Sequence, residues 1–359
     1  MVSSDIEAEV IDESEKDDEE IPYKYLITSY GADYPVESIV KKLEKESIQV
    51  PPFQRDYIWT HSEASRFVES LLLGLPVPGV FLSKDEETQN LLVIDGQQRL
   101  RSLQYFYDGI FRRGPASGKA FLLKNVQTQY EGKTYKTLER EDQLRLDDSI
   151  IHTTIVKQDD PEGDNSSTYL IFERLNTSGR QLYPQEIRNC IFHGELNDVL
   201  KELNTNSHWR KIFGKESTRQ KDLELILRFF SMYFLSDKYQ RPMKAFLNTY
   251  MGYNRHLKKN SAEELRQLFS SAIDVVYKAL SEKAFHPERA LNAAVFDAVM
   301  VGAARRLQKG VVTDLNKFKE KYESLLLRDD FEKAYKTATS DAENVKERLK
   351  LATEAFEGI

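Results

Sequence analysis

The stretch Val93-Ile94-Asp95-Gly96-Gln97-Gln98-Arg99-Leu100 decides how the first half of this chain folds. An apolar strand runs into a carboxylate, a glycine, two carboxamides and an arginine. Apolar side chains then return at the three- and four-residue spacing of an amphipathic helix, at Leu100, Leu103, Tyr107 and Ile110. The sequence therefore predicts a strand-to-helix turn. The first amides of such a helix favour an anion, and Gly96 lets a ligand approach the backbone.

The residues before this turn predict a β-hairpin. A Pro76-Val77-Pro78-Gly79 turn leads into the apolar run 80–82, and the polar stretch 84–90 turns the chain back into the apolar run 91–94. The β-branched run 150–156 predicts another strand. The hairpin thus delivers Asp95 to the start of the following helix.

Helix boundaries are marked by residues that cap or interrupt helices. Thr60 and Glu63 have the spacing of a capping box, and Gly74 ends the helix that follows. Pro184 suits the first turn of a later helix, where its missing N–H costs nothing. From about residue 196 the strand signals fade, and helical periodicity continues over 222–235, 262–280, 290–307 and 312–327.

Length and composition indicate an ordinary soluble protein. At 359 residues the chain has room for about two domains of roughly 150 residues each. It contains no apolar run near the roughly 18 residues that span a bilayer, and its acidic start is unlike a signal peptide. The single cysteine, Cys190, cannot form an internal disulfide. We therefore expect a cytoplasmic protein without a membrane partner.

The net charge of −7 is unevenly distributed. Residues 1–20 hold ten acidic side chains and one basic one, Lys16, so the remainder has 50 basic and 48 acidic side chains. Such an acidic run predicts a disordered tail. The expected organisation is a disordered acidic tail over 1–20, an α/β domain over 21–195 and an all-helical domain over 196–359.

Three polar motifs lie at the ends of predicted elements in the α/β domain. The first contains Gln54 and Arg55, the second is Asp95 to Arg99, and the third contains Arg174 and Asn176. Each combines an arginine with a side-chain amide or carboxylate. A purely structural alternative is that these groups form ion pairs, helix caps and an ordinary helix stop.

The chemistry that these residue types support is phosphoryl transfer. Arg99 and Arg55 would clamp phosphate oxygens with their planar guanidinium groups. Asp95 would hold Mg²⁺ or orient a water molecule. Gln97 or Gln98 would position that water while Arg99 stabilises the developing charge. The predicted catalytic residues are therefore Asp95, Gln97, Gln98 and Arg99.

In these motifs the chain resembles the N-terminal domain of the GmrSD family of bacterial restriction and anti-phage systems. The resemblance covers about residues 25–195 and is carried by VPPFQRDYIW (50–59), VIDGQQRLRSL (93–103) and FERLNTSGRQLYPQEIRN (172–189). It implies a ParB/sulfiredoxin-like α/β fold that binds and hydrolyses a nucleoside triphosphate, with Mg²⁺ as the expected cofactor. The residues that match its nucleotide-binding and other motifs are Gln54, Arg55, Asp95, Gly96, Gln97, Gln98, Arg99, Arg174 and Asn176.

Many relatives continue into an HNH nuclease domain, whereas residues 196–359 predict helices without its histidine and asparagine pattern. We therefore expect a regulatory NTPase that controls a separate nuclease or other defence protein, and an oligomer is compatible with this role. The alternatives are DNA nicking by the ParB-like domain itself and a non-catalytic sensor of nucleotide or DNA. A basic track would bind the DNA through Arg55, Arg99, Arg101, Arg112, Arg113 and Lys119.

Overall fold

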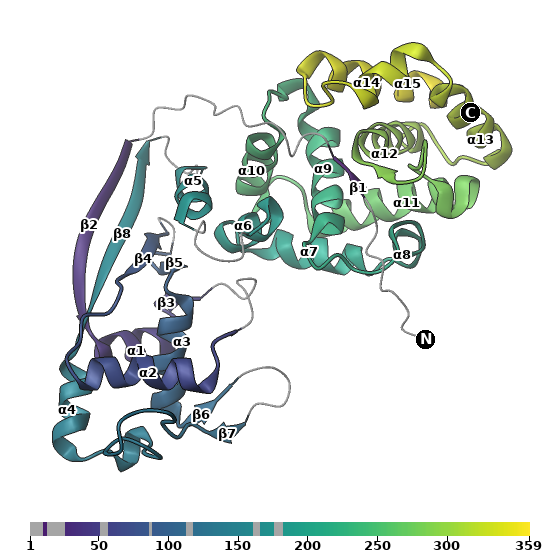
Figure 1. The fold of residues 1–359 in the computed structure, drawn as a ribbon. Helices are drawn as coiled ribbons and strands as arrows, with labels where there is room; N and C mark the ends of the chain where they lie inside the picture. Colours follow the sequence, from purple (N-terminus) through teal and green to yellow (C-terminus); the bar gives the residue numbers. More distant parts are fainter. Residues whose placement is uncertain are drawn as a thin grey trace, which may run out of the picture. The chain divides into compact units, whose positions relative to one another are not determined.

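In a computed structural model of the chain, the described residues are 10–12, 26–50, 57–85, 88–112, 118–160, 166–175 and 182–359. The chain divides into two compact units (Figure 1). Lys24–Leu182 form the first, here called the α/β unit. Met1–Tyr23 and Tyr183–Ile359 together form the second, here called the helical unit. The predicted combination of an α/β domain followed by a helical domain is confirmed.

A five-stranded sheet organises the α/β unit. Its strand order is β2-β8-β4-β5-β3, formed by β2 (Leu26–Pro35), β8 (Ile150–Asp160), β4 (Val80–Lys84), β5 (Leu91–Asp95) and β3 (Ile48–Gln49). Strands β4 and β5 pair antiparallel, as the predicted hairpin requires, and β4 runs parallel to β8. Strand β2 pairs antiparallel with β8 along its whole length. The hairpin therefore lies inside the sheet, which fixes the position of Asp95.

The two faces of the sheet carry different side chains, since successive strand residues point to opposite faces. Val80, Leu82 and Val93 belong to a core shared with α1 (Val36–Glu44), α2 (His61–Leu72) and α3 (Gln97–Asp108). Ser83 points the other way and meets Thr168 of α5 (Ser166–Leu175) at 3.3 Å between the hydroxyl oxygens. The sheet thus separates α1–α3 from α5. The remaining elements are β6 (Ile110–Phe111), β7 (Lys119–Ala120), η2 (Tyr135–Thr137) and α4 (Arg140–Asp148).

The local helix signals are confirmed. Thr60 Oγ1 accepts a hydrogen bond from the Glu63 amide at 3.2 Å, and the Glu63 carboxylate accepts one from the Thr60 amide at 2.7 Å. This is the capping box expected at the start of α2. The helix ends at Leu72, and Gly74 follows with a φ of +69°. Pro184 occupies the first turn of α6 (Pro184–Ile191).

The helical unit is built around α12 (Ala293–Leu307), which is buried along most of its length. It packs against α9 (Lys221–Leu235), α11 (Ala262–Leu280) and α15 (Ala342–Glu357). A Cβ at Gly302 would lie 2.9 Å from the Ala352 carbonyl oxygen of α15. The other helices are α7 (Glu195–Asn204), α8 (Ser207–Phe213), η3 (Ser236–Lys238), α10 (Met243–Asn254), η4 (Ser281–Lys283), α13 (Leu315–Leu326) and α14 (Asp329–Lys336).

Two details differ from the predicted organisation. Within the predicted disordered tail 1–20, the described residues 10–12 include strand β1 (Val10–Ile11), which pairs parallel with β9 (Leu291–Asn292). The rest of that segment lies outside the described residues. The units also divide at residue 182 instead of 195, because α6 packs against α9 and α10 of the helical unit. In the part of the chain that the structure describes, no helix is both long and apolar enough to cross a membrane.

Candidate functional site

The turn at Gly96 joins the end of β5 to the start of α3. Gly96 has a φ of +99°, a left-handed conformation that residues with a side chain rarely adopt. The space around it is also closed, because a Cβ built there would lie 2.4 Å from Cγ1 of Val80. Backbone conformation and packing therefore both require glycine, and they explain the predicted strand-to-helix turn.

Asp95 and Arg99 form an ion pair across this turn. Arg99 Nη2 lies 2.6 Å from Asp95 Oδ2, at the i,i+4 spacing that brings side chains together on a helix. The Arg99 side chain is only 13% exposed, whereas that of Asp95 is 46% exposed. Asp95 therefore orients a largely buried guanidinium, and its own carboxylate stays accessible to solvent.

The start of α3 also offers backbone donors. The Leu100 amide donates to the Gly96 carbonyl at 3.0 Å, so residues 97–99 form the first turn of α3, the end at which helix amides point outward. Gly96 supplies no side-chain cap, and no acidic residue lies in the first turn. These amides, the helix dipole and Arg99 together favour an anion at the turn.

Gln98 connects this turn to the first motif. Its side-chain oxygen accepts hydrogen bonds from the amides of Ile58 at 3.0 Å and Trp59 at 3.2 Å. The Tyr57 hydroxyl lies 2.6 Å from the Ser102 hydroxyl of α3. The described end of the first motif is therefore fixed along α3. Gln54 and Arg55 themselves lie outside the described residues.

An aromatic cluster supports the same segment. The Tyr57 ring meets those of Tyr105 and Phe111 edge to face, with centroids 5.0 and 5.6 Å apart. His61 stacks on Phe111 at 4.5 Å. Burial lowers the pKa of His61, so its ring is neutral at pH 7. No role was predicted for Tyr57 or Ser102, although they lie within the quoted motif strings 50–59 and 93–103.

The third motif begins in α5, which packs against β5 and β8. The Arg174 side chain is exposed near the end of this helix, and Asn176 lies outside the described residues. The structure therefore places α5 on the strand that ends at Asp95.

Within the described ranges, no group of three or more His, Cys, Asp and Glu side chains is placed to hold a metal ion. Two arginines of the predicted basic track pair with acids, Arg99 with Asp95 and Arg112 with Asp108 at 3.2 Å. These pairs reduce the positive charge available to DNA. Arg55 and Arg113 of the track lie outside the described residues.

Comparison with known proteins identifies the region that contains all three motifs. Residues 36–193 match the N-terminal domain of GmrSD restriction endonuclease. This region is a GmrSD N-terminal domain. The GmrSD domain begins with α1 and ends just after α6, so its last helix belongs to the helical unit. The matched description is that of a restriction endonuclease, and the match does not extend to the helices after residue 193.

An uncharacterised protein of Methanocaldococcus jannaschii is also similar to this chain. The two are 30% identical over 91 residues, which cover 19% of this chain and 16% of the relative. The match therefore spans about a sixth of the relative's length.

Replacing Gly96 by alanine tests the turn. The G96A variant combines a strained φ with a contact against Val80. We expect a loss of about 2–4 kcal/mol in the free energy of unfolding, measured by urea denaturation. Gly109 is the matched control, because its φ is +74° and a Cβ there meets nothing within 4 Å. Equal losses in G96A and G109A would contradict the packing argument.

Replacing Gln98 by leucine tests the connection between the first two motifs. The Q98L variant keeps the size of the side chain but removes the acceptor for two amides. We expect faster hydrogen exchange over residues 57–59, with a loss of about 1–3 kcal/mol in stability. The control is Gln97→Leu on the same helical turn. If Q98L exchanged like the wild type there, Gln98 would not hold the segment.

Proposed function

We propose that the GmrSD domain binds the phosphates of a nucleoside triphosphate at the turn from Asp95 to Arg99 and hydrolyses it with Mg²⁺. The observation that carries this proposal is the convergence of an arginine and the first amides of α3 at one glycine turn. Both are groups that bind phosphate. The nucleotide state would then control DNA cleavage by a partner protein in a restriction or anti-phage system.

The residues of the turn take different roles in this proposal. Arg99 stabilises the negative charge that develops on the transferred phosphoryl group, and Asp95 keeps its guanidinium in place. Gln97 orients the attacking water. Because the Gln98 oxygen already accepts two backbone hydrogen bonds, we assign Gln98 the positioning of the first motif.

Magnesium fits a site with few protein carboxylates. Mg²⁺ keeps several water ligands and commonly uses one or two carboxylates together with substrate phosphates. Asp95 has a carboxylate that is 46% exposed and lies at the turn. Asp95 would therefore contribute a direct or water-mediated contact, while the nucleotide supplies the phosphate oxygens. Gln54, Arg55, Arg174 and Asn176 of the first and third motifs would complete the nucleotide site.

A second candidate function is a nucleotide sensor that does not hydrolyse its ligand. The ion pair between Asp95 and Arg99 favours it, because it engages the guanidinium that would otherwise stabilise the charge on the transferred phosphoryl group. Binding without turnover distinguishes this sensor from the NTPase.

The test measures nucleotide binding and phosphate release by the full chain, with each of the four ribonucleoside triphosphates and Mg²⁺. We expect binding of at least one nucleotide and phosphate release that stops when EDTA removes the metal. Arg99→Ala should weaken binding at least tenfold, because a charge-assisted phosphate contact is lost. Gln97→Ala should slow phosphate release at least tenfold with little change in binding.

Arg101→Ala is the matched control, because it removes an arginine from the same helix outside the Asp95 ion pair. Circular dichroism and thermal melts establish that each variant is folded. If folded wild-type protein bound none of the nucleotides, the proposal would be wrong. Binding without phosphate release would favour the sensor.

A further inference from the structure

A second buried charge cluster lies in the helical unit, far along the sequence from the nucleotide motif. Arg228 of α9 donates from Nε and Nη2 to the Asp297 carboxylate of α12 at 3.2 and 2.7 Å. Arg348 of α15 donates from Nη2 to the same carboxylate at 3.4 Å. All three side chains are at most 2% exposed. Two buried guanidinium groups therefore share one carboxylate.

The second carboxylate comes from the N-terminal segment. Asp12 Oδ2 lies 2.5 Å from Arg228 Nη1, and the Asp12 side chain is only 6% exposed. Burial alone lowers the pKa of Arg228, but Asp12 and Asp297 together raise it well above its ordinary value. Glu224 also lies near Arg228, but it already pairs with Arg188 at 2.7 Å. Asp12 thus supplies the charge that balances the cluster.

The surroundings of Arg348 show that the buried cluster depends on its carboxylates for charge balance. Among the described residues, its Nε is buried without a hydrogen-bond partner, although Nη1 donates to the Thr339 carbonyl. Burial lowers the pKa of Arg348, which Asp297 opposes. If Asp12 left, Arg228 would lose one of the two carboxylates with which it forms ion pairs among the described residues, and Asp297 would remain shared with Arg348. An uncompensated buried charge is strongly destabilising, so the cluster selects an acidic occupant.

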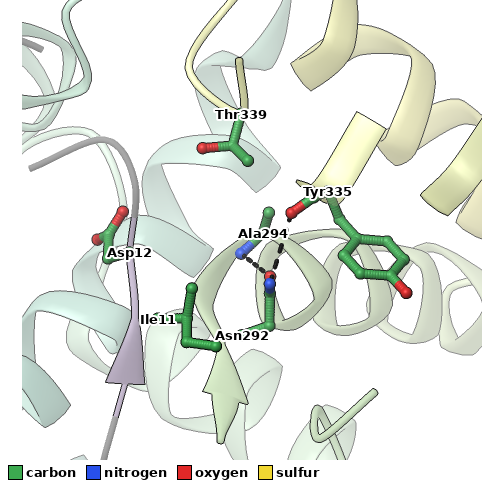
Figure 2. A pocket seen from close by; sticks show the side chains of 6 residues that line it. All are labelled: Ile11, Asp12, Asn292, Ala294, Tyr335 and Thr339. Carbon is green, nitrogen blue, oxygen red and sulfur yellow. Dashed lines mark hydrogen bonds between the residues drawn. The ribbon is translucent and has the colours of Figure 1, made fainter. Parts of the chain in front are cut away.

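Strand β1, which precedes Asp12, contributes little binding free energy of its own. Strand β1 pairs with β9 over only two residues, and Ile11 is 42% exposed. A small pocket, with room for about one water molecule, lies beside the strand. Figure 2 shows Ile11 and Asp12 on one side of it, with Asn292, Tyr335 and Thr339 around the rest. A ladder of two residues binds weakly by itself, and a covalent tether raises its occupancy through a high effective concentration.

We infer that β9, Arg228 and Arg348 form a docking site for an extended acidic strand. Val10–Asp12 occupy this site reversibly, and we call this segment the latch. An acidic peptide of the same sequence can replace it. The occupant in the resting chain is its own N-terminal segment. A partner that fits the site presents an aspartate after two β-branched residues. In such binding, pairing with β9 orients the peptide, and the buried carboxylate supplies the charge that the arginines select.

The latch has a consequence for the α/β unit. The helical unit is made of two chain segments, and residues 24–182 are inserted between them. While β1 is docked, the inserted unit is connected at both of its ends to segments of the helical unit. Release of β1 leaves only the connection at Tyr183. A competing acidic strand would therefore change how the α/β unit is connected to the helical unit, whatever ligand the α/β unit binds.

The test uses a fluorescent peptide of residues 5–15 and measures its anisotropy with the full chain. Wild-type protein should bind it weakly, because its own segment occupies the site. Full-length Asp12→Asn protein should bind it at least tenfold more tightly, since the cis segment has lost its carboxylate. The same peptide carrying Asp12→Asn should bind this variant at least tenfold more weakly. Asp17→Asn protein is the charge-matched control and should behave like the wild type.

Hydrogen exchange of the wild-type chain gives a test that needs no variant. We expect Val10–Asp12 to exchange at least a hundredfold faster than α12, because the latch opens without unfolding the helical unit. Exchange of both segments at one common rate would overturn the releasable latch. Equal peptide binding by wild-type and folded Asp12→Asn protein would overturn the docking site.

Discussion

The left-handed turn at Gly96 is the constraint on which the candidate site depends. Val80 of the neighbouring strand closes the space above it, so no side chain fits there. The turn sets the direction in which α3 leaves the sheet. Asp95 and Arg99 consequently face each other, and Gln98 faces the backbone of Ile58 and Trp59. One glycine thus positions an arginine, a set of helix amides and the end of the first motif.

The two carboxylate–arginine pairs differ in what they allow. The Asp95 side chain is half exposed, and such an ion pair contributes little to the free energy of unfolding. An incoming phosphate can therefore compete for Arg99 with little loss of stability. Asp12 and Arg228 are both almost fully buried, and separating them leaves an unbalanced charge inside the helical unit. The first pair is suited to ligand binding. The second is suited to recognising an acidic strand.

Local features of the fold were predictable because neighbouring residues determine them. The capping box at Thr60, the hairpin before Asp95 and the position of Pro184 all rest on contacts within a few residues. Docking of β1 was not predictable, because Arg228, which pairs with the adjacent Asp12, lies 216 residues away. The acidic composition of the whole segment also obscured the apolar pair Val10 and Ile11. In the site, residue types indicated phosphate binding, but only the folded chain reveals that Gln98 engages the first motif.

Amide hydrogen exchange with and without a saturating non-hydrolysable nucleoside triphosphate and Mg²⁺ shows whether the turn from Asp95 to Arg99 holds the phosphates. If the turn binds phosphate, residues 96–100 at the start of α3 should become protected, while α12 of the helical unit stays unchanged. Nucleotide binding without added protection at residues 96–100 would contradict the account, because the phosphates would then lie elsewhere.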